Sequence, residues 1–304
     1  MKIVENRLTE YLSINVPDDG TPWSSSSTYN YADEVKYENF IYKYAGEDGT
    51  NTENDPAAVW SENKDAYSEW VKIKPTNYYA ALDGKSSTQT TNANNIIMEF
   101  ANESFDTISL LNVSASELRI ELINTIDESV LYEKDYDMQN TVQIVDERSY
   151  WYAPFDFKKE IYEPNLYLVS STKIKVTLSS PGGTAAVGRI VAGQSIFIGD
   201  TLLPATIDQE TYSRFDTDIF GNTDLHQRQS VKVQRYEVKA PVEKIPYLNN
   251  LRAKLTAKPI LFIMDESENS KVNNLLTYGY FTSSPFSVSN AANMTISVNI
   301  KGLV

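Results

Sequence analysis

Trp70-Val-Lys-Ile-Lys-Pro-Thr-Asn-Tyr-Tyr-Ala-Ala-Leu-Asp-Gly-Lys-Ser-Ser87 is the stretch around which this chain of 304 residues is organised. Pro75 restricts Lys74 to extended backbone, and Asp83-Gly84 is a turn signal. The stretch therefore predicts a strand, a bend and the entry into a new domain. We place a boundary here, between an N-terminal unit of residues 1–72 and a second unit that begins at residue 73.

The composition predicts a mainly β protein with more than one domain. A chain of 304 residues, 41% of them hydrophobic, is long enough for two or three domains with a core each. Its 20 tyrosines and four tryptophans belong to residue types that are enriched in strands. There is no cysteine, which excludes disulfides and thiolate metal sites.

The formal net charge of -14 opposes nucleic-acid binding, because it repels phosphates. We therefore expect no sequence-specific nucleic-acid partner, although an acidic wall could still let DNA pass through a channel without sticking. Residues 1–10 lack the apolar core of a signal peptide, and no stretch reaches the apolar length of a membrane span. We expect synthesis in the cytoplasm and no membrane span.

The N-terminal unit is predicted to contain a lead-in strand or short helix within residues 1–16, followed by a small aromatic β module. Strands over 34–37 and 40–44 would form a hairpin with its aromatic residues on one face. The order of aromatics is similar to that of small chitin- and cellulose-binding modules, although Ala32 stands where their pattern has Gly. Trp23, Tyr42 and Trp60 are the candidate glycan-binding residues. Exposed aromatic rings can stack on sugars, but so small a module needs the same rings as its core, and we expect the core role.

Residues 73–199 are predicted to form an antiparallel β-sandwich, for which we choose a jelly roll. Short alternating runs recur at near-regular spacing and are broken by Asn, Asp, Ser, Gly and Pro. Small residues and glycines over 184–193 indicate close approach of neighbouring backbones. The expected strands lie near residues 96–100, 108–111, 118–123, 130–132, 142–145, 150–152, 167–169 and 173–178.

Residues 200–304 are predicted to form an α+β unit with one helix on an antiparallel sheet. Gly221-Asn222 suits a tight hairpin, and the run 231–238 alternates as a strand does. Apolar residues recur at helical spacing after Pro246 and end before Lys258-Pro259. Three further strands are expected over 260–264, 275–281 and 294–300.

The residues that carry chemistry give no catalytic constellation, and we expect no enzyme activity, cofactor or metal. His226 is the only histidine and lies in a polar strand, and no Gly-x-Ser-x-Gly occurs. Acidic pairs such as Asp18-Asp19 and Asp146-Glu147 lie in turn-like polar contexts. A glycosidase is therefore the third prediction, after the structural and the glycan-binding functions given below.

Several motifs, taken in order, resemble a family of structural proteins from the tails of tailed bacteriophages. They are Trp70, Pro75-Thr76-Asn77, Leu82-Asp83-Gly84, the run from Gly182 to Gly193, Asp218 with Phe220-Gly221-Asn222, and Lys301-Gly-Leu-Val304. The resemblance implies carbohydrate-binding-module-like and galactose-binding-like β domains. It also implies a subunit of the virion tail or neck that forms a ring or acts as an adaptor. The implied partners are copies of itself, other tail or neck proteins, and tail fibres or host surface glycan.

The assembly contact is expected within residues 200–304. Arg214, Arg228, Arg235 and Arg252 occur there in an otherwise acidic chain, and arginine is well suited to bidentate pairing with carboxylates. These side chains can meet acidic faces of neighbouring subunits, or they can be ordinary surface charges. A glycan-binding protein that attaches to bacterial surface polysaccharide is the alternative function.

Overall fold

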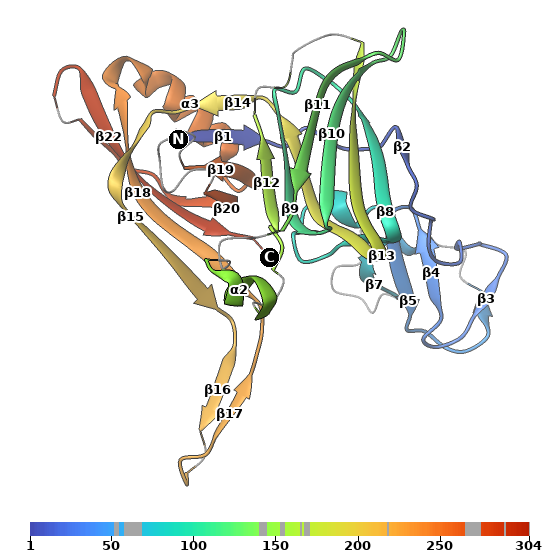
Figure 1. Ribbon diagram of the computed structural model, residues 1–304. Coiled ribbons are helices and arrows are strands. Elements are labelled where there is room, and N and C mark those ends of the chain that lie inside the picture. Colours follow the sequence, from blue (N-terminus) through green and yellow to red (C-terminus); the bar gives the residue numbers. More distant parts are fainter. Residues whose placement is uncertain are drawn as a thin grey trace.

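The computed structural model describes residues 1–51, 55–57, 69–139, 145–152, 156–164, 166, 171–217, 219–264, 275–288 and 290–303. These residues form mainly antiparallel β-sheets with a few short helices, as the composition predicted. Figure 1 shows a C-terminal sheet beside a β-sandwich, and a small aromatic module on the far side of the sandwich. No helix in the described part of the chain is long and apolar enough to span a bilayer.

The sandwich is a network of seven hydrogen-bonded strands. They are β2 (Ser13–Ile14), β8 (Thr90–Ala101), β9 (Thr107–Ser114), β10 (Glu117–Asn124), β11 (Val130–Asp137), β12 (Glu160–Glu163) and β13 (Thr172–Gly193). The order is β11-β10-β13-β8-β2, and β9 pairs with both β13 and β12. Along the first half of β13, buried residues such as Ile174 and Val176 alternate with half-exposed lysines. This period of two is what the sequence pattern predicted.

One predicted strand of the sandwich is wrong, because residues 150–152 lie in a helix, α2 (Glu147–Tyr152). The Ser149 N–H donates to the Asp146 carboxylate at 2.7 Å, which caps the start of this helix. That local capping outweighs the strand preference of three consecutive aromatic residues. The strand expected over 167–169, and most of that over 142–145, fall outside the described residues.

The C-terminal sheet has the strand order β14-β1-β19-β20-β22-β18-β15, with β21 also paired to β22. The strands are β1 (Lys2–Glu5), β14 (Ser195–Phe197), β15 (Asp200–Thr211), β18 (Ser230–Pro241), β19 (Ile260–Ile263), β20 (Leu276–Ser283), β21 (Phe286–Val288) and β22 (Asn293–Gly302). The predicted helix is present as α3 (Ile245–Leu255), which follows the 3-10 turn η3 (Val242–Lys244). Leu248 and Leu255 of α3 belong to the apolar core of this sheet.

The aromatic module contains the predicted hairpin, β4 (Glu34–Tyr37) and β5 (Phe40–Tyr44). The third strand, β7 (Trp70–Pro75), pairs with β5 and begins the stretch from which the domain boundary was inferred. A separate pair, β3 (Thr28–Tyr29) and β6 (Thr50–Asn51), completes the module. The short 3-10 turn η1 (Ala80–Leu82) then leads into the sandwich, where its three residues are buried.

The lead-in residues do not pair within the aromatic module. β1 pairs with β14 and β19, so Ile3 lies opposite both Ile196 and Phe262 in the C-terminal sheet. β2 pairs with β8 of the sandwich. The boundaries at 72 and 199 stay a prediction, but strand pairing assigns β1 and β14 to the C-terminal sheet. In the sequence, the module is thus inserted between strands of the sandwich, and the sandwich is inserted between strands of the C-terminal sheet.

The sandwich and the C-terminal sheet share a buried apolar interface. Val191 of β13 packs in one cluster with Val4 of β1 and Leu261 of β19. Gly193 allows this approach, because a Cβ there would lie 2.3 Å from the carbonyl oxygen of Glu5. Lys232 and Glu160 form an ion pair across the same junction. The second half of β13 is therefore buried on both faces, and the two units are packed together.

Candidate functional site

A long hairpin between β15 and β18 protrudes from the C-terminal sheet. It consists of β16 (Arg214–Thr217) and β17 (Thr223–His226) and is called the arm here, residues 212–228. Figure 1 shows the arm leaving the C-terminal sheet and extending away from the rest of the chain. The Gly221-Asn222 turn predicted from the sequence lies at its tip.

The arm exposes large apolar side chains, none of which belongs to an apolar cluster of the described residues. Phe215 and Leu225 lie directly opposite each other across the hairpin and are 63% and 69% exposed. Ile219 and Phe220, at the tip, are 93% and 83% exposed. Single exposed hydrophobic residues are ordinary, but a row of them on one protruding element is typical of an interaction site.

The arm holds its shape through its own contacts. Arg214 Nε lies 2.7 and 2.8 Å from the Asp216 carboxylate oxygens, and the hydroxyls of Thr217 and Thr223 are 3.1 Å apart. Asp216 and Asp224 lie opposite each other, which places two like charges on neighbouring strands. The arm is therefore an ordered hairpin that carries an electrostatic cost within the single chain.

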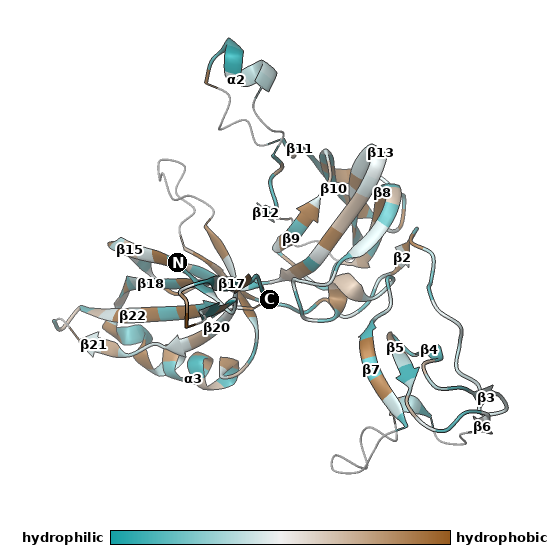
Figure 2. Cartoon of the chain, turned by 90° about the horizontal axis from the view of Figure 1, so that it is seen from below, coloured by the Kyte–Doolittle hydropathy of each residue, from teal (hydrophilic) through white to brown (hydrophobic). Residues whose placement is uncertain are grey.

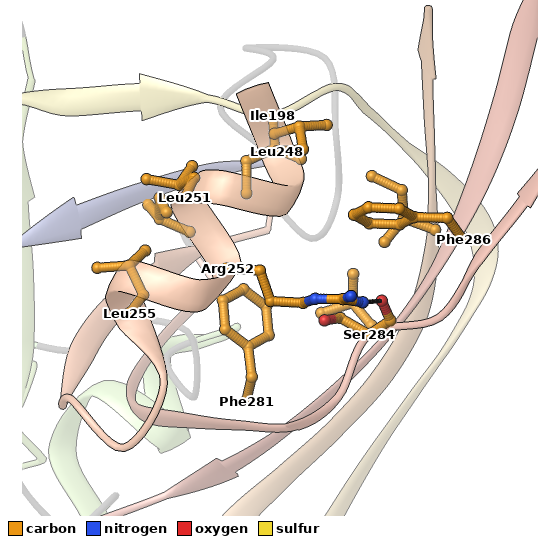
Figure 3. A pocket seen from close by; sticks show the side chains of 11 residues that line it. Ile198, Leu248, Leu251, Arg252, Leu255, Phe281, Ser284 and Phe286 are labelled. Atoms are coloured by element: carbon orange, nitrogen blue, oxygen red, sulfur yellow. Dashed lines mark hydrogen bonds between the residues drawn. The ribbon is translucent and has the colours of Figure 1, made fainter. Parts of the chain in front are cut away.

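A narrow apolar groove, called the α3 groove here, lies between α3 and the C-terminal sheet (Figure 3). Its lining includes Leu248 and Leu251 from α3 and the rings of Phe281 and Phe286 from the strands, and its cavity volume is about 30 Å³. Arg252 extends along its mouth. The Arg252 guanidinium donates to the carbonyl oxygen of Ser284 at 2.9 Å and lies 4.9 Å from the centre of the Phe286 ring.

The four predicted assembly arginines do not form one cluster. Arg214 and Arg228 lie on the arm, and Arg235 lies on β18 beside an open hollow of about 330 Å³. Arg252 lies on α3 at the groove. All four side chains are exposed, so each is accessible to a partner. Their role in assembly stays a prediction.

The predicted glycan-binding residues are not brought together on a surface. Tyr42 is 5% exposed and packs in one cluster with Tyr44 and Trp70, and burial, with Glu38 and Asp55 nearby, raises the pKa of its hydroxyl. Trp23 is half-buried and meets the Tyr37 ring edge-on at 5.7 Å. Trp60 lies outside the described residues. Tyr42 thus lies in the module's core and Trp23 packs against it, and the glycan-binding role of the three residues stays a prediction.

Sequence reasoning missed a group of exposed aromatic residues on α2. Tyr150, Trp151 and Tyr152 are exposed, and the rings of Tyr150 and Trp151 meet edge-on at 5.4 Å. Figure 2 shows α2 standing away from the sandwich. The signal in the sequence was the capping pattern from Asp146 to Ser149, which marks a helix start just before the aromatic run.

The described residues offer no metal centre, since no group of three or more potential ligands lies together among them. His226 is exposed on the arm. The buried Glu163 carboxylate accepts hydrogen bonds from the Tyr132 hydroxyl at 2.6 Å, from Lys134 Nζ at 2.7 Å and from the Tyr136 hydroxyl. These contacts satisfy the carboxylate and tie β12 to β11, which is a structural role.

Comparisons with known proteins give little similarity. No protein-family model matches the chain, and no curated protein matches it. Among solved structures, the lectin domain of lectinolysin complexed with Lewis B antigen is similar, with 13% identity and a TM-score of 0.26. The similar region covers 38% of this chain and 83% of that one. A likeness of this size does not establish a shared ligand.

Proposed function

We propose that this chain is a non-enzymatic structural subunit of a tailed-bacteriophage virion, in the tail or neck, that joins its neighbours through the arm. The observation that carries the proposal is the ordered hairpin with Phe215, Ile219, Phe220 and Leu225 exposed. Fully burying such a side chain contributes about 1.5–3 kcal/mol, so the exposed apolar side chains of the arm can contribute to a specific contact. The virion assignment rests on the sequence motifs that resemble tail proteins.

Other features support a scaffold rather than a catalyst. The sandwich and the C-terminal sheet are joined by a continuous apolar interface, which gives the arm a rigid base. Within the described residues, the buried carboxylate Glu163 is fully engaged by its neighbours. The net charge of -14 would let DNA pass a ring of such subunits without binding.

The test of this function is the location of the chain in particles. Antibodies raised against the purified protein should label the tail or neck of tailed virions in a lysate that contains its gene. Purified particles should contain the chain in a fixed number of copies. Particles without the chain, or hydrolysis of cell-wall or capsule polysaccharide by the clean protein, would contradict the proposal.

Glycan binding is the second candidate, and the aromatic residues of α2 favour it. Exposed Tyr and Trp rings can stack on the apolar faces of sugars, at about 1 kcal/mol for each stacked ring. Trp151→Ala should then weaken binding to a glycan array roughly fivefold. Trp23→Ala is the control and should leave binding unchanged in any molecule that remains folded. An array without any signal for the wild-type chain removes this candidate.

A further inference from the structure

We infer that the arm of one chain docks on the α3 groove of a second copy, with Ile219 and Phe220 over the apolar mouth and Asp224 paired with Arg252. This inference rests on the proposed function of the arm and names its partner surface. The two surfaces have matching chemistry. The tip of the arm exposes the apolar side chains of Ile219 and Phe220, and the groove is apolar and opens at the surface of α3.

The charges beside the two apolar surfaces are complementary. Asp216 and Asp224 lie opposite each other next to the tip, and only Asp216 has the Arg214 side chain as an ion-pair partner in the described chain. Cations from a partner surface would relieve this like-charge pair.

The α3 segment supplies such cations. Residues 244–258 contain Lys244, Arg252, Lys254 and Lys258 and no acidic residue. Lys254 and Lys258 already pair with Glu5, at 3.7 and 3.1 Å. Arg252 contacts neutral acceptors and an aromatic ring, and no carboxylate in the described chain lies within ion-pair distance of it. Lys244 lies over the Phe197 ring at 5.1 Å and does not line the groove, so Arg252 is the cation at the groove that can meet an incoming carboxylate.

The placement of the two surfaces requires a second molecule. Figure 1 shows α3 at one end of the C-terminal sheet and the arm leaving from the opposite end. A contact between different surfaces of identical chains is heterologous, so it links chains head to tail. Such links close into a ring when the rotation per subunit allows it and otherwise give filaments. A symmetric pairing of two arms would instead bring Asp216 and Asp224 of both copies together.

The volume of the groove limits how deeply the arm can insert. A cavity of about 30 Å³ corresponds to about one water molecule, which is too small for a whole phenyl ring. The tip therefore lies across the mouth and does not insert deeply, and Arg252, which is exposed, can turn from Ser284 toward the carboxylate. The contact depends on surface residues, and variants at these positions should fold.

The first experiment is a charge exchange measured by sedimentation velocity on the purified full chain. Wild type should show concentration-dependent oligomers. Arg252→Glu and Asp224→Arg should each weaken association about tenfold or more. The chain that carries both substitutions should associate again, because the cation then lies on the arm and the carboxylate on α3. Lys239→Glu, an exposed change on β18 outside both the arm and the lining of the groove, is the control and should associate as wild type.

The second experiment uses the absence of cysteine from the natural chain. Phe220→Cys in one preparation and Leu251→Cys in another should form a disulfide between chains only when the two are mixed under oxidising conditions. A chain without the arm should also pair one to one with an Arg252→Glu chain and grow no further.

Three results would overturn the inference. They are a wild-type chain that stays monomeric at its highest soluble concentration, a Phe220→Cys chain that cross-links tip to tip as fast as the mixture, and a double charge exchange without recovery. If antibodies still label the tail or neck in these cases, the proposed function stands and the arm binds another tail or neck protein.

Discussion

Two hairpins of this chain each carry an apolar cross-strand pair, which is buried in one hairpin and exposed in the other. In the aromatic module, Val35 of β4 lies opposite Tyr42 of β5, and both are buried. In the arm, Phe215 of β16 lies opposite Leu225 of β17, and both are exposed. The difference is the third strand, because β7 pairs with β5 and brings Trp70 against the module's core. A cross-strand apolar pair becomes a core only when another element covers it, and without that element it is a surface for a partner.

The largest expected effect comes from removing the covering residue of the module. Trp70→Ala should destabilise the module by about 3–5 kcal/mol, because a fully buried indole is replaced by a cavity. Trp151→Ala is the matched control, the same chemical change on the exposed helix α2, and should stay within about 0.5 kcal/mol. Urea unfolding followed by tryptophan fluorescence and circular dichroism checks both. Equal losses in the two variants would contradict the comparison.

Deleting the arm should have a small effect on stability and a large one on association. Tyr212 N–H donates to the Gln229 carbonyl at 3.1 Å, so an Asn-Gly turn can replace residues 213–228 where the ladder already closes. The free energy of unfolding should change by about 1 kcal/mol or less. Thermal melting and sedimentation velocity measure the two quantities on the same sample. A large loss of stability would mean that the arm packs on the body.

Removing one of the two facing aspartate charges should stabilise the arm but weaken its contact with a second chain. Asp224→Asn should stabilise the hairpin by roughly 0.2–1 kcal/mol, because like charges no longer face each other. The same change should weaken self-association. Amide hydrogen exchange of the arm gives the first effect. Asp208→Asn on β15, opposite Val233, is the control and should change neither.

The smallest effect concerns the ion pairs that anchor β1. Burial raises the pKa of Glu5, but Lys258, Lys254 and Arg7 lower it more, so its pKa lies below the usual 4.5. A lowered pKa in the folded state stabilises the protein above about pH 4.5, and this contribution is lost as the pH falls through the lowered value. The difference in melting temperature between wild type and Glu5→Gln should therefore shrink on acidification. A constant difference from pH 6 to pH 3 would contradict this assignment.

The sequence predicted most local elements, because they depend on local patterns. The hairpin of β4 and β5, the helix α3 and the turn at Gly221 follow from spacing and turn chemistry that a few neighbouring residues contain. Residues 150–152 form a helix and not the predicted strand, because capping by Asp146 outweighs the strand preference of the aromatic run.

The candidate site was harder to predict, because exposure depends on what packs against a residue. Phe215 and Leu225 alternate with polar residues as core residues do, and only the tertiary structure shows that they are exposed. The arginine pattern did select Arg252, but its position beside an apolar groove depends on Phe281 and Phe286, which come from distant strands.

The pairing of β1 with β19 also constrains the order in which the chain can fold as it is synthesised. Ile3 lies opposite both Ile196 and Phe262, so the second partner strand of β1 exists only after some 250 residues have been translated. The module and the sandwich can complete their own pairing before that, whereas β1 still lacks its neighbour β19. Closing so long a separation carries a high entropic cost and makes the C-terminal sheet the slow step of folding. The arm gains a finished base only when this last sheet closes, and the proposed association through the arm then follows the folding of the whole subunit.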